Sequence, residues 1–242
     1  IEPSQGIHLV LDLEFLGGDT GIMIPKTDDG RVLFAIPWHG KVVLGTTDTP
    51  EVPVELEPRP QEDEIDYLIE HAGRYLAKAP THADIRATFA GLRPLVRPKS
   101  DAGSTAAISR DHSLFVSESG LVTIAGGKWT TYRKMAQDTV DRAAQQGRLP
   151  IKPCLTEDLT LMDRPAAETE LTERKPEWEA KLDPEFPWLV ADVVAAVRHE
   201  MACTVDDVLS RRTRLSFLDQ AAAERVTPKV REILERERGA VW

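Results

Sequence analysis

The chain has 242 residues, of which 41% are hydrophobic and 29% charged, which is typical of a globular protein with enough apolar residues for a core. Its formal net charge of −10 argues against a nucleic-acid partner, because phosphate binding needs concentrated lysine and arginine. Two cysteines are too few for a disulfide scaffold and indicate a reduced, cytosolic protein. The sequence contains no apolar run of the ~18 residues that a membrane span requires. Because it opens at Ile1 and leads at once into an apolar strand, we expect it to be the later part of a longer protein.

The first part of the chain predicts mainly β structure. Short, mostly apolar runs bounded by turn residues predict strands at 7–11, 21–25, 31–38, 41–46 and 84–90. His39-Gly40 between two of these runs is typical of a hairpin turn. Prolines make 50–60 a loop, and apolar residues at helical spacing predict a one-sided helix over 62–78. Residues 91–102, with two further prolines, are predicted as a loop.

Two more strands, 114–116 and 121–125, are expected around the turn 117–120. They lead into Gly126-Gly127 and then a helix over about 130–146. From about residue 155 the charge density rises and strand patterns disappear. Thr204 with Asp207 resembles a capping box, and Thr227-Pro228 resembles a second helix start, so this region predicts a separate all-helical domain.

The strand, glycine pair and helix around Gly126-Gly127 form the most informative local pattern. Glycines let a backbone approach a flat ligand, and free amides at a helix N-terminus stabilise developing negative charge, which suits the pyrimidine edge of a flavin. The alternative is an ordinary strand-to-helix turn with packing glycines, because paired glycines alone are a weak signal.

Cations recur through the same region. Arg93, Arg97, Arg110 and Lys128 could together hold a phosphate ester, because arginine suits bidentate recognition of anions. Each could equally be a solvated surface residue. His8 lies within an apolar strand, where a general base and a hydrogen-bonded core histidine are both open interpretations.

Several other chemistries find no motif in this sequence. There is no G-x-S-x-G around a nucleophilic serine, and the histidines show no H-x-x-x-H metal pair, so no metal site is predicted. There is also no G-x-G-x-x-G after a strand, so the chain shows no dinucleotide-binding fingerprint of its own.

The ordered motifs resemble those of the aerobic, FAD-dependent glycerol-3-phosphate dehydrogenases, over about residues 4–147. The matching stretches are Ser4-Gln5-Gly6-Ile7-His8, Ile36-Pro37-Trp38 together with Gly45-Thr46-Thr47-Asp48, Gly91-Leu92-Arg93-Pro94, Ile108-Ser109-Arg110-Asp111, and Gly126-Gly127-Lys128 through Thr130-Thr131-Tyr132-Arg133. The tail is similar to the family's helical C-terminal domain, notably at 206–214. Five ordered motifs are far more specific than any one of them.

The resemblance implies oxidation of sn-glycerol 3-phosphate to dihydroxyacetone phosphate, with hydride transfer to FAD and electrons passed to a membrane quinone. It implies that His8 is the base for the C2 hydroxyl and that Arg93 orients the substrate and stabilises developing charge. Arg110 and Lys128 match substrate and phosphate contacts, whereas Arg97 matches no functional position and is left as surface. The positions that match flavin contacts are Gly126, Gly127, Lys128, Trp129 and Thr130.

The fold predicted from these observations is α+β. Residues 1–150 are expected to form a substrate-binding cap on antiparallel sheet, with about 106–150 returning to the FAD domain as strands and a helix, and 151–242 an all-helical domain. Because the dinucleotide fingerprint is missing, the chain alone is not expected to retain FAD. The resemblance also implies peripheral association with the inner face of the cell membrane, and a homodimer is left open. Two alternatives remain: a glycerol-3-phosphate oxidase that reduces oxygen, and a non-catalytic fragment that docks to a membrane or partner.

Overall fold

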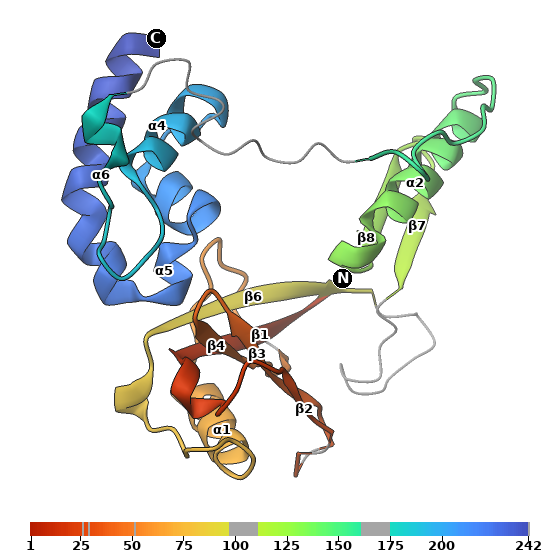
Figure 1. The fold of residues 1–242 in the computed structure, drawn as a ribbon. Coiled ribbons are helices and arrows are strands. Elements are labelled where there is room, and N and C mark those ends of the chain that lie inside the picture. The colour runs from red at the N-terminus through yellow and green to blue at the C-terminus, as the bar shows by residue number, and fades with distance from the viewer. Residues whose placement is uncertain (26, 29, 51, 97–110, 161–174, 242) are drawn as a thin grey trace. The chain divides into compact units, whose positions relative to one another are not determined.

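The structure is a computed structural model, and it describes residues 1–241 except 26, 29, 51, 97–110 and 161–174 (Figure 1). Its contacts cluster into two compact units. The first unit consists of Ile1–Ile7, Thr46–Glu64 and Ala90–Met162. The second unit consists of His8–Gly45, Ile65–Phe89 and Asp163–Trp242.

The predicted α+β class is confirmed, with antiparallel sheet in the N-terminal part and helices at the C-terminus. The larger sheet has the strand order β2-β3-β4-β1-β5, and β6 also pairs with β1. The bounds of its strands are β1 Glu2–Asp12, β2 Ile22–Ile24, β3 Leu33–Trp38, β4 Lys41–Gly45, β5 Thr49–Pro50 and β6 Ala87–Leu95. Short 3-10 turns lie at η1 Leu13–Phe15 and η2 His82–Asp84, and helix α1 spans Glu62–Gly73.

The predicted hairpin is confirmed. Trp38 pairs with Lys41 across β3 and β4, which leaves His39 and Gly40 as a two-residue turn. Both turn residues have positive φ, 48° and 76°, as the tight turn that matches strand twist requires. The turn conformation at His39-Gly40 is therefore the one that the sequence predicted.

Two predicted boundaries are wrong. Residues 91–95 form a strand rather than a loop, because β6, which pairs with β1, runs from Ala87 to Leu95. Proline lacks an N–H donor and is confined to positions where the ladder does not need one, which is why Pro94 suggested a loop. The helix predicted over 62–78 ends five residues early, at Gly73, a residue with weak helix propensity.

A second sheet pairs β7 (His112–Val116) with β8 (Val122–Gly126) in antiparallel register, as predicted. The 3-10 turn η4 (Trp129–Thr131) follows, and helix α2 (Tyr132–Gln146) ends at Gly147. Met135, Ala136, Val140 and Ala143 recur at helical spacing along α2, but none of the helix's 15 residues, all of which the structure describes, is buried. Strands and helix are therefore where the sequence placed them, without a covered core on α2.

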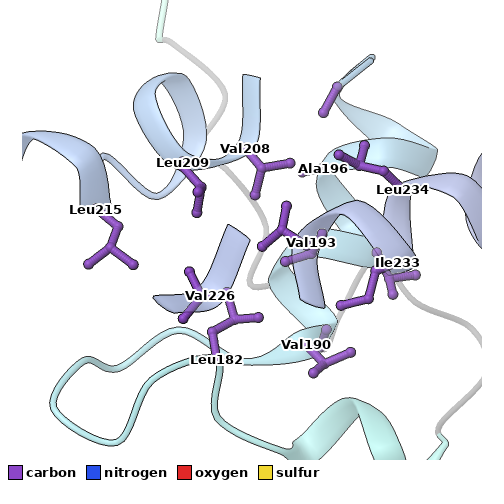
Figure 2. Packing of buried hydrophobic residues seen from close by; sticks show 14 of the residues in the cluster. Leu182, Val190, Val193, Ala196, Val208, Leu209, Leu215, Val226, Ile233 and Leu234 are labelled. Atoms are coloured by element: carbon purple, nitrogen blue, oxygen red, sulfur yellow. The ribbon is translucent and has the colours of Figure 1, made fainter. Parts of the chain in front are cut away.

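Residues 175–241, here called the helical domain, have a core of their own (Figure 2). Their elements are η5 Pro176–Glu179, α4 Val190–His199, the π-helical turn η6 Asp207–Arg212, α5 Leu215–Leu218 and α6 Gln220–Val241. Leu182, Val193, Leu209, Leu215 and Ile233 are among the buried side chains that pack together in this core. The helical character predicted for the C-terminal part is therefore confirmed over 175–241, whereas its boundaries as a separate domain stay a prediction.

One predicted cap in the helical domain is confirmed and one is wrong. Thr204 and Asp207 form the reciprocal box, with Asp207 N–H donating to Thr204 Oγ1 at 3.1 Å and Thr204 N–H donating to Asp207 Oδ2 at 2.9 Å. Thr227-Pro228 does not start a helix, because Pro228 lies inside α6. The helix begins earlier, where Asp219 Oδ1 accepts the N–H of Ala222 at 2.8 Å.

Among the residues that the structure describes, no helix combines the length and apolar character needed to cross a membrane. The same residues contain no group of three or more His, Cys, Asp or Glu side chains arranged to hold a metal ion.

Candidate functional site

Arg93 lies on β6 in the first unit, and its guanidinium is held at several points. Its Nη2 donates to Thr46 Oγ1 at 3.2 Å and to the carbonyl oxygen of Thr47 at 3.1 Å, and its Nη1 lies 3.6 Å from Asp48 Oδ1. The Arg93 side chain is 24% exposed, so it is placed by its partners while part of it remains open to solvent. A planar, permanently charged fork in such a setting suits the binding of an anionic group.

Gly6 makes room for this guanidinium. A Cβ atom on Gly6 would lie 2.6 Å from Nη1 of Arg93, closer than any real side chain could approach. Ser4, two residues earlier on β1, donates its hydroxyl to the Asp48 carboxylate. The motifs around Ser4–Gly6 and Thr46–Asp48, which the sequence analysis matched only by order, therefore meet at Arg93.

A buried carboxylate supports the segment that binds Arg93. Glu64 is 4% exposed, and its two oxygens accept four hydrogen bonds. The donors are Gln5 Nε2 at 2.7 Å, Thr47 Oγ1 at 2.9 Å, Thr49 Oγ1 at 2.6 Å and the N–H of Gln61 at 3.0 Å. Thr47 Oγ1 in turn accepts the N–H of Ile7 at 3.1 Å. Buried carboxylates are stable only when they are hydrogen-bonded in this way, so Glu64 fixes the backbone whose carbonyl receives Arg93.

His8 belongs to the second unit and has a different setting. Its half-buried ring stacks on Phe89 of β6, with ring centroids 4.8 Å apart and an interplanar angle of 13°. Gly45 stands opposite His8 in the pairing of β1 and β4, and a Cβ atom there would lie 2.8 Å from Nε2 of His8. A glycine on the neighbouring strand and an aromatic face on the other therefore define the space that the imidazole occupies.

The glycine pair at the end of β8 has a backbone reason for its identity. Gly126 and Gly127 have φ of 77° and 81°, a region that residues with a side chain rarely adopt. A Cβ on Gly126 would lie 2.8 Å from the carbonyl oxygen of Asp111, and one on Gly127 would collide with Met135. Backbone conformation and packing thus explain why both positions are glycine. Any structural support for flavin binding here must come from the residues after them, Lys128–Thr130.

The residues after the glycines are exposed at the start of a helix. Lys128, Trp129 and Thr130 are all exposed, and the Trp129 ring, 85% exposed, stacks on Tyr132 with centroids 5.4 Å apart. Thr131 closes the turn, because its N–H donates to the Lys128 carbonyl at 3.0 Å and its Oγ1 accepts the Lys128 N–H at 3.2 Å. A lysine, a large aromatic face and the N-terminus of α2 side by side fit the edge of a planar, electron-accepting cofactor such as a flavin.

The predicted site residues thus fall into separate settings. The structure brings Arg93 together with the Ser4–Gly6 and Thr46–Asp48 motifs, and it places Lys128 at the end of the second sheet. Arg110 and Arg97 lie outside the described residues. Sequence reasoning assigned no role to Glu64 or Phe89. Glu64 follows the proline-rich segment without any motif of its own, so its burial was not visible in the sequence.

Two family models match the chain. One, described as FAD dependent oxidoreductase, matches residues 1–133. The other, described as the C-terminal domain of alpha-glycerophosphate oxidase, matches residues 164–241.

Similar proteins give the same picture. The mitochondrial glycerol-3-phosphate dehydrogenase of Mesocricetus auratus is 37% identical, over 98% of this chain and 37% of the relative. That of Arabidopsis thaliana is 36% identical, over 97% of this chain and 44% of the relative. A solved glycerol-3-phosphate dehydrogenase from Bacillus halodurans, complexed with FAD, matches with a TM-score of 0.72 and 26% identity, over 98% of this chain and 53% of that one. The chain therefore spans less than half of these curated relatives and about half of the solved structure.

Proposed function

Because the chain belongs to the FAD-dependent oxidoreductase family, we propose that it forms the substrate-binding part of a glycerol-3-phosphate dehydrogenase. The family membership confirms the resemblance found in the sequence. In this proposal the complete enzyme converts sn-glycerol 3-phosphate to dihydroxyacetone phosphate. The observation that carries it is the convergence of two matched motifs, Ser4–Gly6 and Thr46–Asp48, on the guanidinium of Arg93.

The residues of this chain would bind and orient the substrate. His8 takes the proton of the C2 hydroxyl on an imidazole nitrogen, while Arg93 holds the substrate oxygen and stabilises the negative charge that builds on it. Arg110 and Lys128 bind the phosphate ester, since cations suit a doubly charged group. Bound FAD would supply the acceptor for the hydride that leaves C2. The Lys128–Thr130 turn, with Gly126 and Gly127, would hold one edge of that cofactor. Residues 1–150 would form the substrate region, and residues 151–242 a C-terminal region that includes the helical domain.

The decisive experiment replaces Arg93 by lysine in the complete enzyme. Lysine keeps the positive charge but loses the fork that reaches Thr46 and Thr47. We expect kcat to fall by about 10²-fold or more, the scale of removing one preorganised donor to a developing charge. Arg110→Lys should instead raise KM, because phosphate is bound alike in the ground and transition states.

Arg74→Lys is the matched control for this experiment. Arg74 is another forked arginine, with Nη1 2.9 Å from Asp28 Oδ1, but it lies just after α1, pairs with exposed carboxylates, and its replacement should leave kcat unchanged. Flavin content and melting temperature are compared first. Wild-type turnover of Arg93→Lys would show that Arg93 only packs against its partners.

A second proposal concerns FAD retention by the chain alone. The sequence contains no dinucleotide-binding fingerprint, so the adenosine and pyrophosphate of FAD have no recognisable site in it. We expect the purified chain to lack the absorption band at about 450 nm that oxidised flavins show. A stoichiometric flavin band in its visible spectrum would contradict this.

The electron acceptor has two candidates. We propose a membrane quinone reached by peripheral association with the inner face of the cell membrane. The description of the family model at 164–241 as part of an alpha-glycerophosphate oxidase supports the alternative, reduction of oxygen. Turnover of the complete enzyme with an artificial quinone under nitrogen, compared with turnover in air without quinone, separates the two.

A further inference from the structure

The imidazole of His8 is the end of an aromatic contact chain that begins in the helical domain. Phe89 of β6 stacks on His8, and its other neighbour is Phe217 of α5, with ring centroids 5.2 Å apart and an interplanar angle of 49°. All three residues belong to the second unit. Phe89 therefore contacts both the predicted base and a ring on a helix that is more than a hundred residues later in the sequence.

The helix that carries Phe217 is firmly anchored. Leu215 and Leu218 on either side of it are fully buried in the core of the helical domain, whereas Phe217 is only partly buried and faces Phe89. Short four-residue helices have little stability of their own, so the two leucines set the direction in which the Phe217 ring points.

The corner after α5 is tied to the start of β6 by the backbone. The N–H of Gln220 donates to the carbonyl oxygen of Arg86 at 3.0 Å, one residue before β6 begins. Arg86 is itself held to the sheet, because its N–H donates to Val10 at 2.8 Å and its Nε donates to Asp12 Oδ2 at 2.9 Å. The strand bearing Phe89 and the helix bearing Phe217 are therefore fixed to each other at a second point, and the ring contact is not left to two mobile side chains.

We propose that Phe217 and Phe89 are positioning residues, through which the helical domain sets the orientation of the His8 imidazole. The inference rests on the proposed role of His8 as the base. An imidazole stacked face to face on a ring has one preferred plane, and contact with a second ring restricts how far the Phe89 ring can turn. Gly45 completes the slot from the neighbouring strand, since a side chain there would displace the imidazole.

Misorientation of a base affects the step that moves the proton and leaves substrate binding unchanged. Displacement of a catalytic group by about 1 Å can cost about 10²-fold in rate, so a partial loss of support should cost less. We expect Phe89→Leu to lower kcat of the complete enzyme about 10-fold and Phe217→Leu about 3-fold, both with unchanged KM. Phe217→Tyr, which keeps the ring, should restore wild-type kcat.

The double variant tests whether Phe217 acts through Phe89. If it does, the kcat of Phe89→Leu/Phe217→Leu equals that of Phe89→Leu alone, because the second ring has nothing left to support. The histidine ring signals in NMR give a readout that does not depend on turnover. The His8 signal should move in Phe89→Leu, and by less in Phe217→Leu, as the neighbouring ring current is lost or shifts.

Phe186→Leu is the matched control within the same domain. Phe186 is a buried ring of the helical domain that stacks on Trp188 at 5.7 Å and lies under the Lys41 ammonium. Phe186→Leu therefore removes the same atoms as Phe217→Leu, but from a ring whose described aromatic partner is Trp188 and not Phe89. It should lower the melting temperature and leave kcat and the His8 signal unchanged. An equal fall in kcat for Phe186→Leu and Phe217→Leu would show that both act through stability, which would overturn the inference.

His8→Gln separates the failure of the inference from the failure of the proposed function. If His8→Gln is inactive while Phe217→Leu turns over normally, only the positioning role is wrong. If His8→Gln turns over like wild type, His8 is not the base and the positioning inference fails with it. Additive effects in the double variant, or a rise in KM with constant kcat, would also overturn it.

Discussion

Two helical regions of the molecule differ in how far their apolar residues are buried. One is the helical domain, and the other is the layer formed by β7, β8 and α2, here called the α2 layer. The helical domain encloses its own apolar residues, and Val193 of α4 is 0% exposed. In the α2 layer, Val140 of α2 is 66% exposed and no residue of that helix is buried. Apolar periodicity in a sequence therefore shows which face of a helix seeks a partner, and it does not show that the partner is in the same chain.

This difference agrees with the proposed function. The curated relatives are more than twice as long as this chain, and their remaining length is available to cover the α2 layer. Several exposed large apolar residues in one layer, here Phe115, Trp129, Tyr132 and Val140, are typical of an interface. In this view the apolar faces of the helical domain are already covered, whereas that of α2 is not.

The same substitution, valine to alanine, made in both regions tests this contrast with the largest expected effect. Val193→Ala removes buried methyl groups and should lower the free energy of unfolding by about 2–3 kcal/mol, from the lost transfer energy and the cavity left behind. Val140→Ala should be neutral or stabilising by a few tenths of a kcal/mol in this chain, because alanine has the higher helix propensity. Urea unfolding followed by circular dichroism measures both.

The complete enzyme gives the opposite expectation for Val140 alone. If the additional length of the proposed complete enzyme covers α2, Val140→Ala becomes destabilising there, while Val193→Ala costs the same in both proteins. A cost for Val140→Ala in this chain equal to that of Val193→Ala would mean that α2 already packs against something, and the contrast would be wrong.

A smaller effect tests the backbone of the α2 layer. Gly126→Ala forces a side chain into φ of 77° and brings its Cβ to 2.8 Å from the carbonyl oxygen of Asp111. The left-handed conformation alone costs about 1–2 kcal/mol for a residue with a Cβ atom. Gly18→Ala, where no atom lies within 4 Å of the new Cβ, is the control and should not destabilise the chain. Equal thermal midpoints for the two variants would contradict the described turn.

Local chemistry explains what the sequence could predict. The His39-Gly40 turn and the Thr204–Asp207 box depend on residues within a few positions of each other, and both are confirmed. Thr227-Pro228 failed although it has the same local form. Val226 and Val230 on either side are buried, so the packing of a long helix outweighs the hydrogen bond that Pro228 removes.

The candidate site was harder to predict from the sequence, because its residues contact partners that are far away along the chain. Arg93 could be singled out by its chemistry, but its partners Thr46 and Thr47 are more than forty residues earlier. The extension of β6 past Gly91 depends on pairing with β1, which no local pattern reports. Contacts of high sequence separation leave no periodicity to detect, so Phe89 and Glu64 appeared only with the fold.

The smallest expected effect concerns a carboxylate in the helical domain. Hydrogen bonds from the backbone N–H of Cys203, and then from Thr204, hold the pKa of Asp207 below its usual range. A lowered pKa means that the ionised form stabilises the folded state. That contribution is complete above the pKa of the unfolded chain, about 3.9, and is lost as the pH falls through the lower pKa of the folded state.

Asp207→Asn should therefore destabilise the chain at neutral pH and progressively less in acid. Asparagine retains one acceptor oxygen but loses the charge, and the carboxylate is partly exposed, so we expect a cost of only about 0.5–1 kcal/mol at pH 7. The difference in thermal midpoint from wild type should shrink as the pH is lowered below about 4, because the wild-type carboxylate is then protonated as well. Asp206→Asn is the neighbouring control, since Asp206 is exposed and makes no side-chain cap. A difference between Asp207→Asn and wild type that stays constant from pH 7 to pH 3 would show that Asp207 stabilises the turn through its shape rather than its charge.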